Sequence, residues 1–274
     1  MDGSSREKLD RPPELASMFN RAAAGYDARP GYPTRVFDVL ARPCGLGSDS
    51  RVLEIGPGTG QATVPMLDLG AAVTAVEPGA ELAHLLSERC AGRTLEVIAG
   101  RFETVELPDA AFDLVVAATS FHWVDPTVGF ERSAQCLRDD GWLALWWTIW
   151  GDPDRPDPFH EALVPILSAK APHLLDAEAG AGAYIGDIAA RVAEIGGTGM
   201  FGPVEQETIV WDGTHDPPAL RAMFATFAAW IALPEPLRGE MLDDVARVAR
   251  EGFDGKVTRP YRTVVYTARR RPRP

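Results

Sequence analysis

The chain has 274 residues, and its 39 acidic side chains outnumber its 27 basic ones, which gives a formal net charge of −12. This charge argues against nucleic acid as the main partner, because proteins bind phosphate backbones with basic surfaces. The length is ample for a full hydrophobic core, so we expect one α/β domain that spans residues 1–274.

The cysteines are three in number and far apart in the sequence, at Cys44, Cys90 and Cys136. This pattern favours a reducing compartment and argues against a disulfide framework or a zinc site. A signal-peptide pattern is absent, and no apolar run approaches the roughly 18 residues that a membrane helix needs. We therefore expect a cytoplasmic protein with no membrane segment and no metal.

The most informative segment is residues 51–60, with the sequence RVLEIGPGTG. A short apolar strand leads there into Gly56, Gly58 and Gly60, and a loop of glycines lets backbone N–H groups approach a ligand closely. In the dinucleotide fingerprint Gly-x-Gly-x-x-Gly, the third glycine would fall at Gln61. The spacing therefore argues against NAD or FAD as the ligand.

Apolar runs and helical periodicity alternate through the rest of the first half. Further strands are expected at residues 73–76, 95–98, 112–118 and 142–147, with helices at residues 81–90 and 127–137 between them. The run at 112–118 is nearly continuous in its apolar character, as in a strand buried on both faces. This order predicts a doubly wound, mostly parallel sheet.

Two acidic residues accompany the glycines. Glu77 ends the second strand, 17 residues after Gly60, where a carboxylate can accept hydrogen bonds from both ribose hydroxyls of a nucleoside. Glu54 lies inside the first strand and needs a partner, because an unpaired buried carboxylate is costly. That partner is either a ligand or a basic side chain such as Arg29.

The second half changes character at residues 151–158, which hold three prolines and cannot form a strand or helix interior. We expect an insertion from residue 151 to about residue 202, with helices near 159–169 and 185–195 and a Gly/Ala-rich break at 179–183. Asp216 and Pro217 then open a helix with Leu220, Phe224, Phe227 and Ile231 on one face. The other expected elements are strands at 204–211 and 257–268 and a helix at 236–251.

The segment from Glu54 to Gly60 resembles the first motif of the class I S-adenosylmethionine-dependent methyltransferases, which reads acid-x-Gly-x-Gly-x-Gly. The resemblance implies a seven-stranded Rossmann-like sheet whose last strand is antiparallel and lies between the fifth and sixth. It also implies that Glu77 and the following Pro78 contact the cofactor, and that Glu54 faces its amino group. Phe102, after the third strand, either stacks on the adenine or belongs to the core.

The segment Thr119-Ser120-Phe121-His122-Trp123 follows the fourth strand, at the sheet edge where ligands bind in open α/β folds. It looks like the Phe-His-Trp segment of a small-molecule branch that includes trans-aconitate-type methyltransferases. Thr119 would then contact the cofactor. His122 is either a general base on an acceptor hydroxyl or a residue that only holds a loop or the cofactor.

Residues 19–33 also resemble this branch, in which such a segment folds over the cofactor, and we expect residues 1–33 to form an N-terminal lid. Tyr26 would supply apolar area and a hydroxyl near the sulfonium, and Arg29 would pair with the cofactor carboxylate. A packing helix without ligand contact is the alternative. The insertion at 151–202 would form part of a substrate lid.

The resemblance therefore implies transfer of a methyl group from S-adenosylmethionine to a small molecule, with an oxygen acceptor favoured. A protein that binds the cofactor without methyl transfer is one alternative, since its binding motifs would be the same. A NAD-linked oxidoreductase is the other, which the glycine spacing disfavours.

Overall fold

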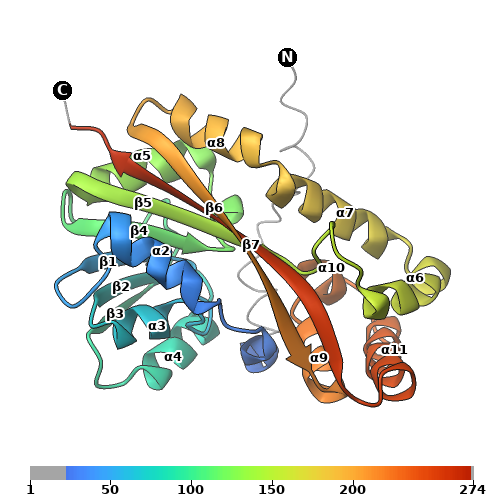
Figure 1. The fold of residues 1–274 in the computed structure, drawn as a ribbon. Coiled ribbons are helices and arrows are strands. Elements are labelled where there is room, and N and C mark those ends of the chain that lie inside the picture. Colours follow the sequence, from blue (N-terminus) through green and yellow to red (C-terminus); the bar gives the residue numbers. More distant parts are fainter. Residues whose placement is uncertain (1–22, 273–274) are drawn as a thin grey trace.

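The computed structural model describes residues 23–272 (Figure 1). Residues 1–22, which hold most of the expected N-terminal lid, lie outside the described part. The strands form one seven-stranded sheet in the order β3-β2-β1-β4-β5-β7-β6. They are β1 Arg51–Ile55, β2 Ala72–Glu77, β3 Leu95–Ala99, β4 Phe112–Ala118, β5 Leu137–Ile149, β6 Phe201–His215 and β7 Val257–Arg270.

The pairing of the strands confirms the predicted fold class. Strands β3, β2, β1, β4 and β5 run parallel to one another, whereas β7 is antiparallel to both β5 and β6, between which it lies. The order of the strands in the sheet changes direction between β1 and β4. The carboxyl ends of these two strands therefore flank the crevice where open α/β sheets bind ligands.

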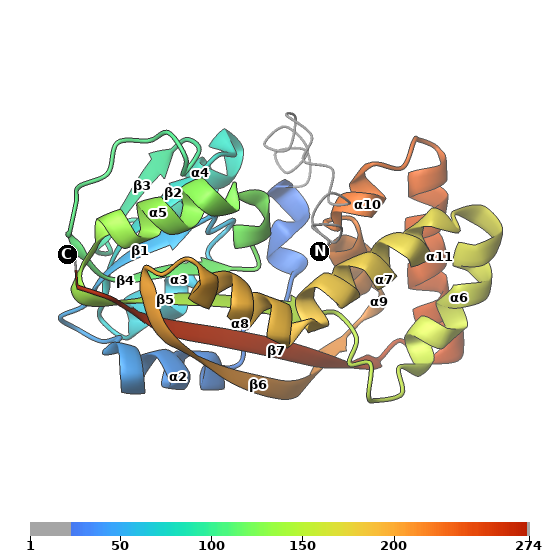
Figure 2. The same ribbon diagram turned by 90° about the horizontal axis from the view of Figure 1, so that it is seen from above.

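The helices cover both faces of the sheet and extend beyond one end of it. They are η1 Ala23–Ala28, α2 Thr34–Cys44, α3 Thr63–Asp68, α4 Ala80–Arg89, η2 Phe121–Trp123, α5 Pro126–Cys136, α6 Pro158–Lys170, α7 His173–Gly186, α8 Ile188–Gly197, α9 Pro217–Phe224, α10 Ala228–Ile231 and α11 Leu237–Gly252. Figure 2 shows α2 on one face of the sheet and α5 and α8 on the other. Helices α6, α9, α10 and α11 lie together at the far end of β6 and β7.

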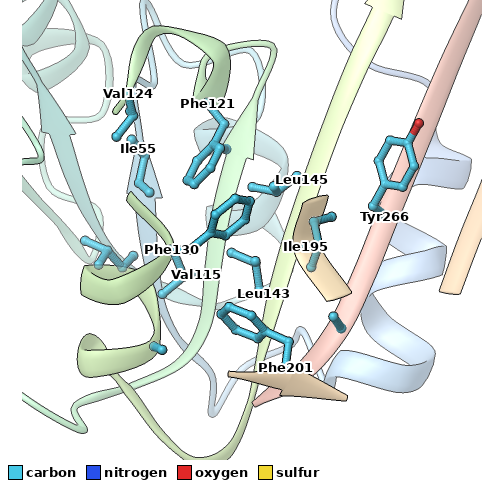
Figure 3. Close-up of a cluster of buried hydrophobic side chains, with 14 of the residues drawn as sticks. Ile55, Val115, Phe121, Val124, Phe130, Leu143, Leu145, Ile195, Phe201 and Tyr266 are labelled. Atoms are coloured by element: carbon cyan, nitrogen blue, oxygen red, sulfur yellow. The ribbon is translucent and has the colours of Figure 1, made fainter. Parts of the chain in front are cut away.

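The hydrophobic core is divided by the sheet, and β4 contributes to both halves. Val115 (Figure 3) and Ala117 pack on the face covered by α5 and α8, and Leu114 and Val116 pack on the face covered by α2, α3 and α4. Because successive side chains of a strand point to opposite faces, a strand buried on both sides is apolar at nearly every position. The apolar run at 112–118 was correctly predicted on this ground.

A third apolar cluster joins α6 of the insertion to α9, α10 and α11. Phe159 and Leu163 of α6 pack there with Leu220 and Phe224 of α9, and all four side chains are at most 1% exposed. The chain between β5 and β6 is therefore packed at its start against the helices that follow β6.

Two predictions about helix limits were wrong. Helix α7 runs through residues 179–183, because the alanines there are strong helix formers, and each glycine costs only about 1 kcal/mol relative to alanine. The helix opened by Asp216 ends at Phe224 and a separate helix begins at Ala228. Between them the Thr226 hydroxyl donates to the Met223 carbonyl at 2.6 Å, a local bond that competes with helix continuation.

Within residues 23–272, no helix combines the length and the apolar character needed to cross a membrane. The three cysteines are buried as free thiols. No group of three or more His, Cys, Asp or Glu side chains in this part of the chain is arranged to hold a metal ion.

Candidate functional site

The loop between β1 and α3 requires glycine for two reasons: its backbone conformation, and the close packing of neighbouring side chains. Gly56, Gly58 and Gly60 all have positive φ, at 66°, 59° and 98°, a region that other residues rarely adopt. A Cβ on Gly58 would lie 2.8 Å from the ring of Tyr26, and one on Gly56 would lie 2.7 Å from Cβ of Ser120. The loop is therefore closely packed between the N-terminal segment and the segment after β4.

Glu77, at the end of β2, is connected to this loop. Its carboxylate accepts the backbone N–H of Gly58 at 3.1 Å and that of Gly79 at 2.9 Å. Burial raises the pKa of Glu77 to about 6, although the two N–H donors oppose the shift. An ionised carboxylate has about four acceptor positions, so these two bonds leave capacity for ligand hydroxyls. Pro78 is exposed between Glu77 and Gly79.

Glu54 is fully buried in β1 and has only one of its oxygens hydrogen-bonded. Oε2 accepts the hydroxyl of Thr63 at 2.6 Å, whereas Oε1 has no hydrogen-bond partner within the described residues. Burial raises the pKa of Glu54 to about 7, Thr63 opposes the shift, and the charge of Glu77 reinforces it. A ligand ammonium group would supply the missing donor and the counter-charge.

The alternative partner for Glu54, Arg29, is engaged elsewhere. Its Nε donates to the Thr226 hydroxyl at 2.9 Å, and its Nη2 donates to the Thr226 carbonyl at 2.8 Å. Its Nη1 donates to the Tyr26 hydroxyl at 3.2 Å. Arg29 and Tyr26 therefore join the glycine loop to the end of α9, and no pair of Arg29 with Glu54 forms.

The residue after β4 carries backbone strain. Thr119 has a φ of 55°, which is an outlier for a β-branched residue. Its N–H donates to the carbonyl of Trp146 at 2.7 Å, and its hydroxyl accepts from Tyr32 at 3.1 Å. Such strain persists where the surroundings impose it, and it is common at binding and active sites. The sequence gives no sign of this conformation.

His122 lies in η2, three residues after this strained residue. Its Nδ1 accepts a hydrogen bond from the indole N–H of Trp147 in β5 at 3.1 Å. Because an indole N–H can only donate, Nδ1 holds a lone pair, and the proton of the neutral ring is on Nε2. The ring also lies 4.6 Å from that of Trp123 and 6.3 Å from that of Tyr184, between centroids.

Phe102 belongs to the core rather than to an open surface. Its side chain is 3% exposed within the cluster on the α5 face, and the guanidinium carbon of Arg132 lies 5.6 Å from the centre of its ring. This leaves little of the ring for stacking on an adenine. The structure thus favours the second of the two alternatives considered for this residue.

The fold brings together Tyr26, Glu54, Glu77, Thr119 and the three glycines at the carboxyl ends of β1, β2 and β4. Sequence reasoning missed Thr63 and Trp147, which bond to Glu54 and His122. Thr63 is the first residue of the helix after the glycine loop, and its hydroxyl was the feature of the sequence that could have indicated a partner for Glu54. Nothing in the spacing of Trp147 and His122 indicates that they meet.

Comparisons with known proteins agree with this geometry. Residues 53–145 match a family model described as a methyltransferase domain. A methyltransferase of Mycobacterium tuberculosis, described as uncharacterized, is 27% identical over 236 residues, which are 86% of either chain. A malonyl-[acyl-carrier protein] O-methyltransferase of Geobacter sulfurreducens is 32% identical over 149 residues, which are 51% of this chain and 54% of that one.

Among solved structures, a phosphoethanolamine N-methyltransferase 2 of Haemonchus contortus in complex with S-adenosyl-L-methionine superposes with a TM-score of 0.54. It is 15% identical, and the match covers 98% of this chain and 60% of that one. At this identity the likeness shows the shared fold alone.

Together, the methyltransferase domain at residues 53–145, the relatives and the seven-stranded fold support a class I S-adenosylmethionine-dependent methyltransferase. S-adenosylmethionine is accordingly the cofactor that we assign. The narrower resemblance to the trans-aconitate-type branch stays a prediction.

Proposed function

We propose that this protein transfers the methyl group of S-adenosylmethionine to an oxygen of a small-molecule acceptor. The observation that supports it most is the buried Oε1 of Glu54, which lacks a hydrogen-bond partner within the described residues and lies beside the glycine loop. The cofactor carries an ammonium group that would satisfy this oxygen. The name of the Geobacter relative, an O-methyltransferase, favours oxygen as the acceptor atom.

The cofactor would be held by groups from three strands. Glu77 would accept the ribose hydroxyls, Glu54 would bind the ammonium group, and the Gly56–Gly60 loop would allow close approach of the backbone. Tyr26, Arg29 and Thr119 would close the site from the N-terminal side and from the end of β4. Pro78 would contribute apolar contact next to Glu77.

The cofactor, when bound, supplies a methyl group already activated by its sulfonium. The main task of the chain is then to hold the acceptor atom in line with that methyl group, and positioning of this kind is worth about 7–11 kcal/mol in favourable cases. We propose that residues 1–33 and 151–202 act as the two lids that exclude water and hold the acceptor, within one domain that spans residues 1–274.

We propose that His122 contacts the acceptor. Its hydrogen bond from Trp147 leaves the proton of the neutral ring on Nε2, so in this arrangement Nε2 is a donor. To act as a base, the ring would have to take a proton at Nδ1 and release Trp147. Donation to an acceptor oxygen is therefore the role that the geometry favours over proton removal.

His122→Gln and His122→Ala separate these roles, because a glutamine amide can replace the Nε2–H donor but cannot act as a base. If His122 is a donor, Gln should retain most of the kcat that Ala loses. If it is a base, both variants should lose about 10²- to 10⁴-fold in kcat, and the acidic limb of the pH profile should disappear with them. Equal, small losses would mean that His122 only holds the loop.

The proposal as a whole is tested by incubating the full chain with S-adenosylmethionine and pools of small metabolites, and by measuring S-adenosylhomocysteine formed. Calorimetry with S-adenosylhomocysteine and with NAD⁺ gives the binding preference independently of turnover. Tight binding without methyl transfer to any pool would support a cofactor-binding protein that is not a methyltransferase. Preference for NAD⁺ would refute the proposal.

A further inference from the structure

Arg191 in α8 is a buried cation with an unsatisfied donor. The residue is 6% exposed, and its Nε is buried without a hydrogen-bond partner in residues 23–272. Glu194, one turn away, balances its charge with an Nη1 to Oε2 distance of 3.0 Å. Leaving a buried N–H group of a guanidinium unbonded is costly, and the buried Oε1 of Glu194 does not bond to it within the described residues. The Nε–H of Arg191 therefore stays available to an acceptor from a ligand.

A chain of aromatic rings connects this guanidinium to the candidate site. The carbon Cζ of Arg191 lies 3.8 Å from the ring centre of Tyr184 in α7. The Tyr184 ring in turn lies 6.3 Å from His122 and 6.3 Å from Trp147, between centroids. Figure 2 shows α7 and α8 following each other along the same face of the sheet. Arg191 therefore belongs to the side of the site where the insertion covers β5 and β7.

A second unsatisfied donor lies in the same cluster. Tyr266 of β7 (Figure 3) is 1% exposed, and its hydroxyl has no hydrogen-bond partner in the described part of the chain. Its ring lies 5.9 Å from that of Trp147, between centroids. Burial raises the pKa of Tyr266 to about 12, the charge of Arg191 lowers it, and Asp187 and Tyr184 raise it further. The hydroxyl of Tyr266 is thus close enough to the guanidinium of Arg191 for the charge to act on it.

We propose that Arg191 and the hydroxyl of Tyr266 bind a carboxylate group of the methyl acceptor. Both side chains offer unused donors, and a carboxylate matches the planar guanidinium. The rings of Tyr184, Trp147 and Tyr266 would contact the carbon skeleton of the acceptor. Because Glu194 already carries negative charge beside the cation, a singly charged carboxylate fits this site better than a doubly charged phosphate. The inference rests on the methyl transfer proposed above and specifies the class of its acceptor.

The test uses the full chain saturated with S-adenosylhomocysteine, with benzoate as the probe and benzamide as its neutral isostere. Calorimetry should show benzoate binding at least about 10-fold more tightly than benzamide, as expected for a charge-assisted hydrogen bond. Arg191→Met, with Glu194→Gln to avoid an unpaired carboxylate, should weaken benzoate binding by about 10- to 100-fold. The exposed Arg250 of α11 gives a matched control, and Arg250→Met should bind benzoate as the wild type does.

Tyr266→Phe distinguishes a binding role from a packing role. It removes a hydroxyl that has no bond, so the melting temperature should stay the same or rise, while benzoate affinity should fall by about 10-fold. The inference is overturned if benzoate does not bind at millimolar concentration, if it binds no better than benzamide, or if both variants bind it normally. Failure of S-adenosylhomocysteine to bind a folded chain would instead refute the proposed function.

Discussion

Replacing Glu54 by glutamine should change the pH dependence of both stability and cofactor binding. Glutamine keeps a carbonyl oxygen for the Thr63 hydroxyl but removes the ionisable group, whose pKa is raised from 4.5 to about 7 by burial. Between these two pH values the folded state binds more protons than the unfolded state. The stability associated with Glu54 is therefore fully present below pH 4.5 and is lost as the pH rises through 7.

The shift is large enough to measure. A difference of about 2.5 pKa units corresponds to roughly 3 kcal/mol of unfolding free energy lost by the wild type across this range. Urea denaturation at several pH values from 4.5 to 8 should show the wild type losing this much more stability than Glu54→Gln. Comparing slopes with pH cancels any constant cost of burying the glutamine amide. Identical slopes would show that Glu54 is not the titrating group.

Ligand binding should have the opposite trend with pH, because an ammonium group binds the ionised form of Glu54. If only that form binds, the affinity for S-adenosylhomocysteine should increase about 30-fold between pH 5.5 and pH 8. Glu54→Gln should bind weakly and with little dependence on pH. Calorimetry in buffers of different ionisation enthalpy would also detect the released proton. Equal pH dependence in both proteins would refute the contact between Glu54 and the ammonium group.

Four further substitutions test the residues that would surround the cofactor. Glu77→Ala should weaken S-adenosylhomocysteine binding at least about 10-fold, since a charged acceptor is lost; unchanged affinity in calorimetry would exclude Glu77 from the site. Gly58→Ala should cost about 2 kcal/mol in urea denaturation, because its φ of 59° is strained for alanine and the new Cβ would lie 2.8 Å from the ring of Tyr26. Adding Tyr26→Ala should recover part of that loss. No recovery would mean that the contact between residue 58 and the ring of Tyr26 does not matter for stability. Arg29→Ala should cost about 1–2 kcal/mol through its bonds to Thr226 and should also lower cofactor affinity, whereas normal affinity would contradict closure of the site by this segment.

The parts of the fold that were predictable are those where local sequence and burial agree. The strand at 112–118 is apolar at every position except Asp113, and both of its faces are covered by helices. Asp216 and Pro217 provide a cap and a first helical residue, and α9 begins at Pro217 with the Asp216 carboxylate accepting the N–H of Ala219. In the strand, burial dominates, and at the start of α9 the helix cap dominates. Both can be recognised from residues that are neighbours in the sequence.

The parts that were not predictable depend on contacts between distant segments. The break between α9 and α10 coincides with Thr226, whose hydroxyl and carbonyl accept from Arg29, 197 residues earlier in the chain. The tautomer of His122, which lies in η2, is set by Trp147 of β5. No local pattern encodes these pairings, because they exist only after the sheet has brought its strand ends together.

The charges of Glu54 and Glu77 also bear on the choice between S-adenosylmethionine and NAD as the cofactor. Glu54 and Glu77 are buried on adjacent strands, each with a raised pKa, and in the described part of the chain neither forms an ion pair with a cation. Their hydrogen-bond donors there are neutral: the hydroxyl of Thr63 and the backbone N–H groups of Gly58 and Gly79. A ligand that brings positive charge next to Glu54 relieves the repulsion between the two carboxylates. A dinucleotide, which would place a negatively charged pyrophosphate at the same glycine loop, would increase that repulsion. Glycine spacing and buried charge thus give independent reasons, one geometric and one electrostatic, for a cationic cofactor over NAD.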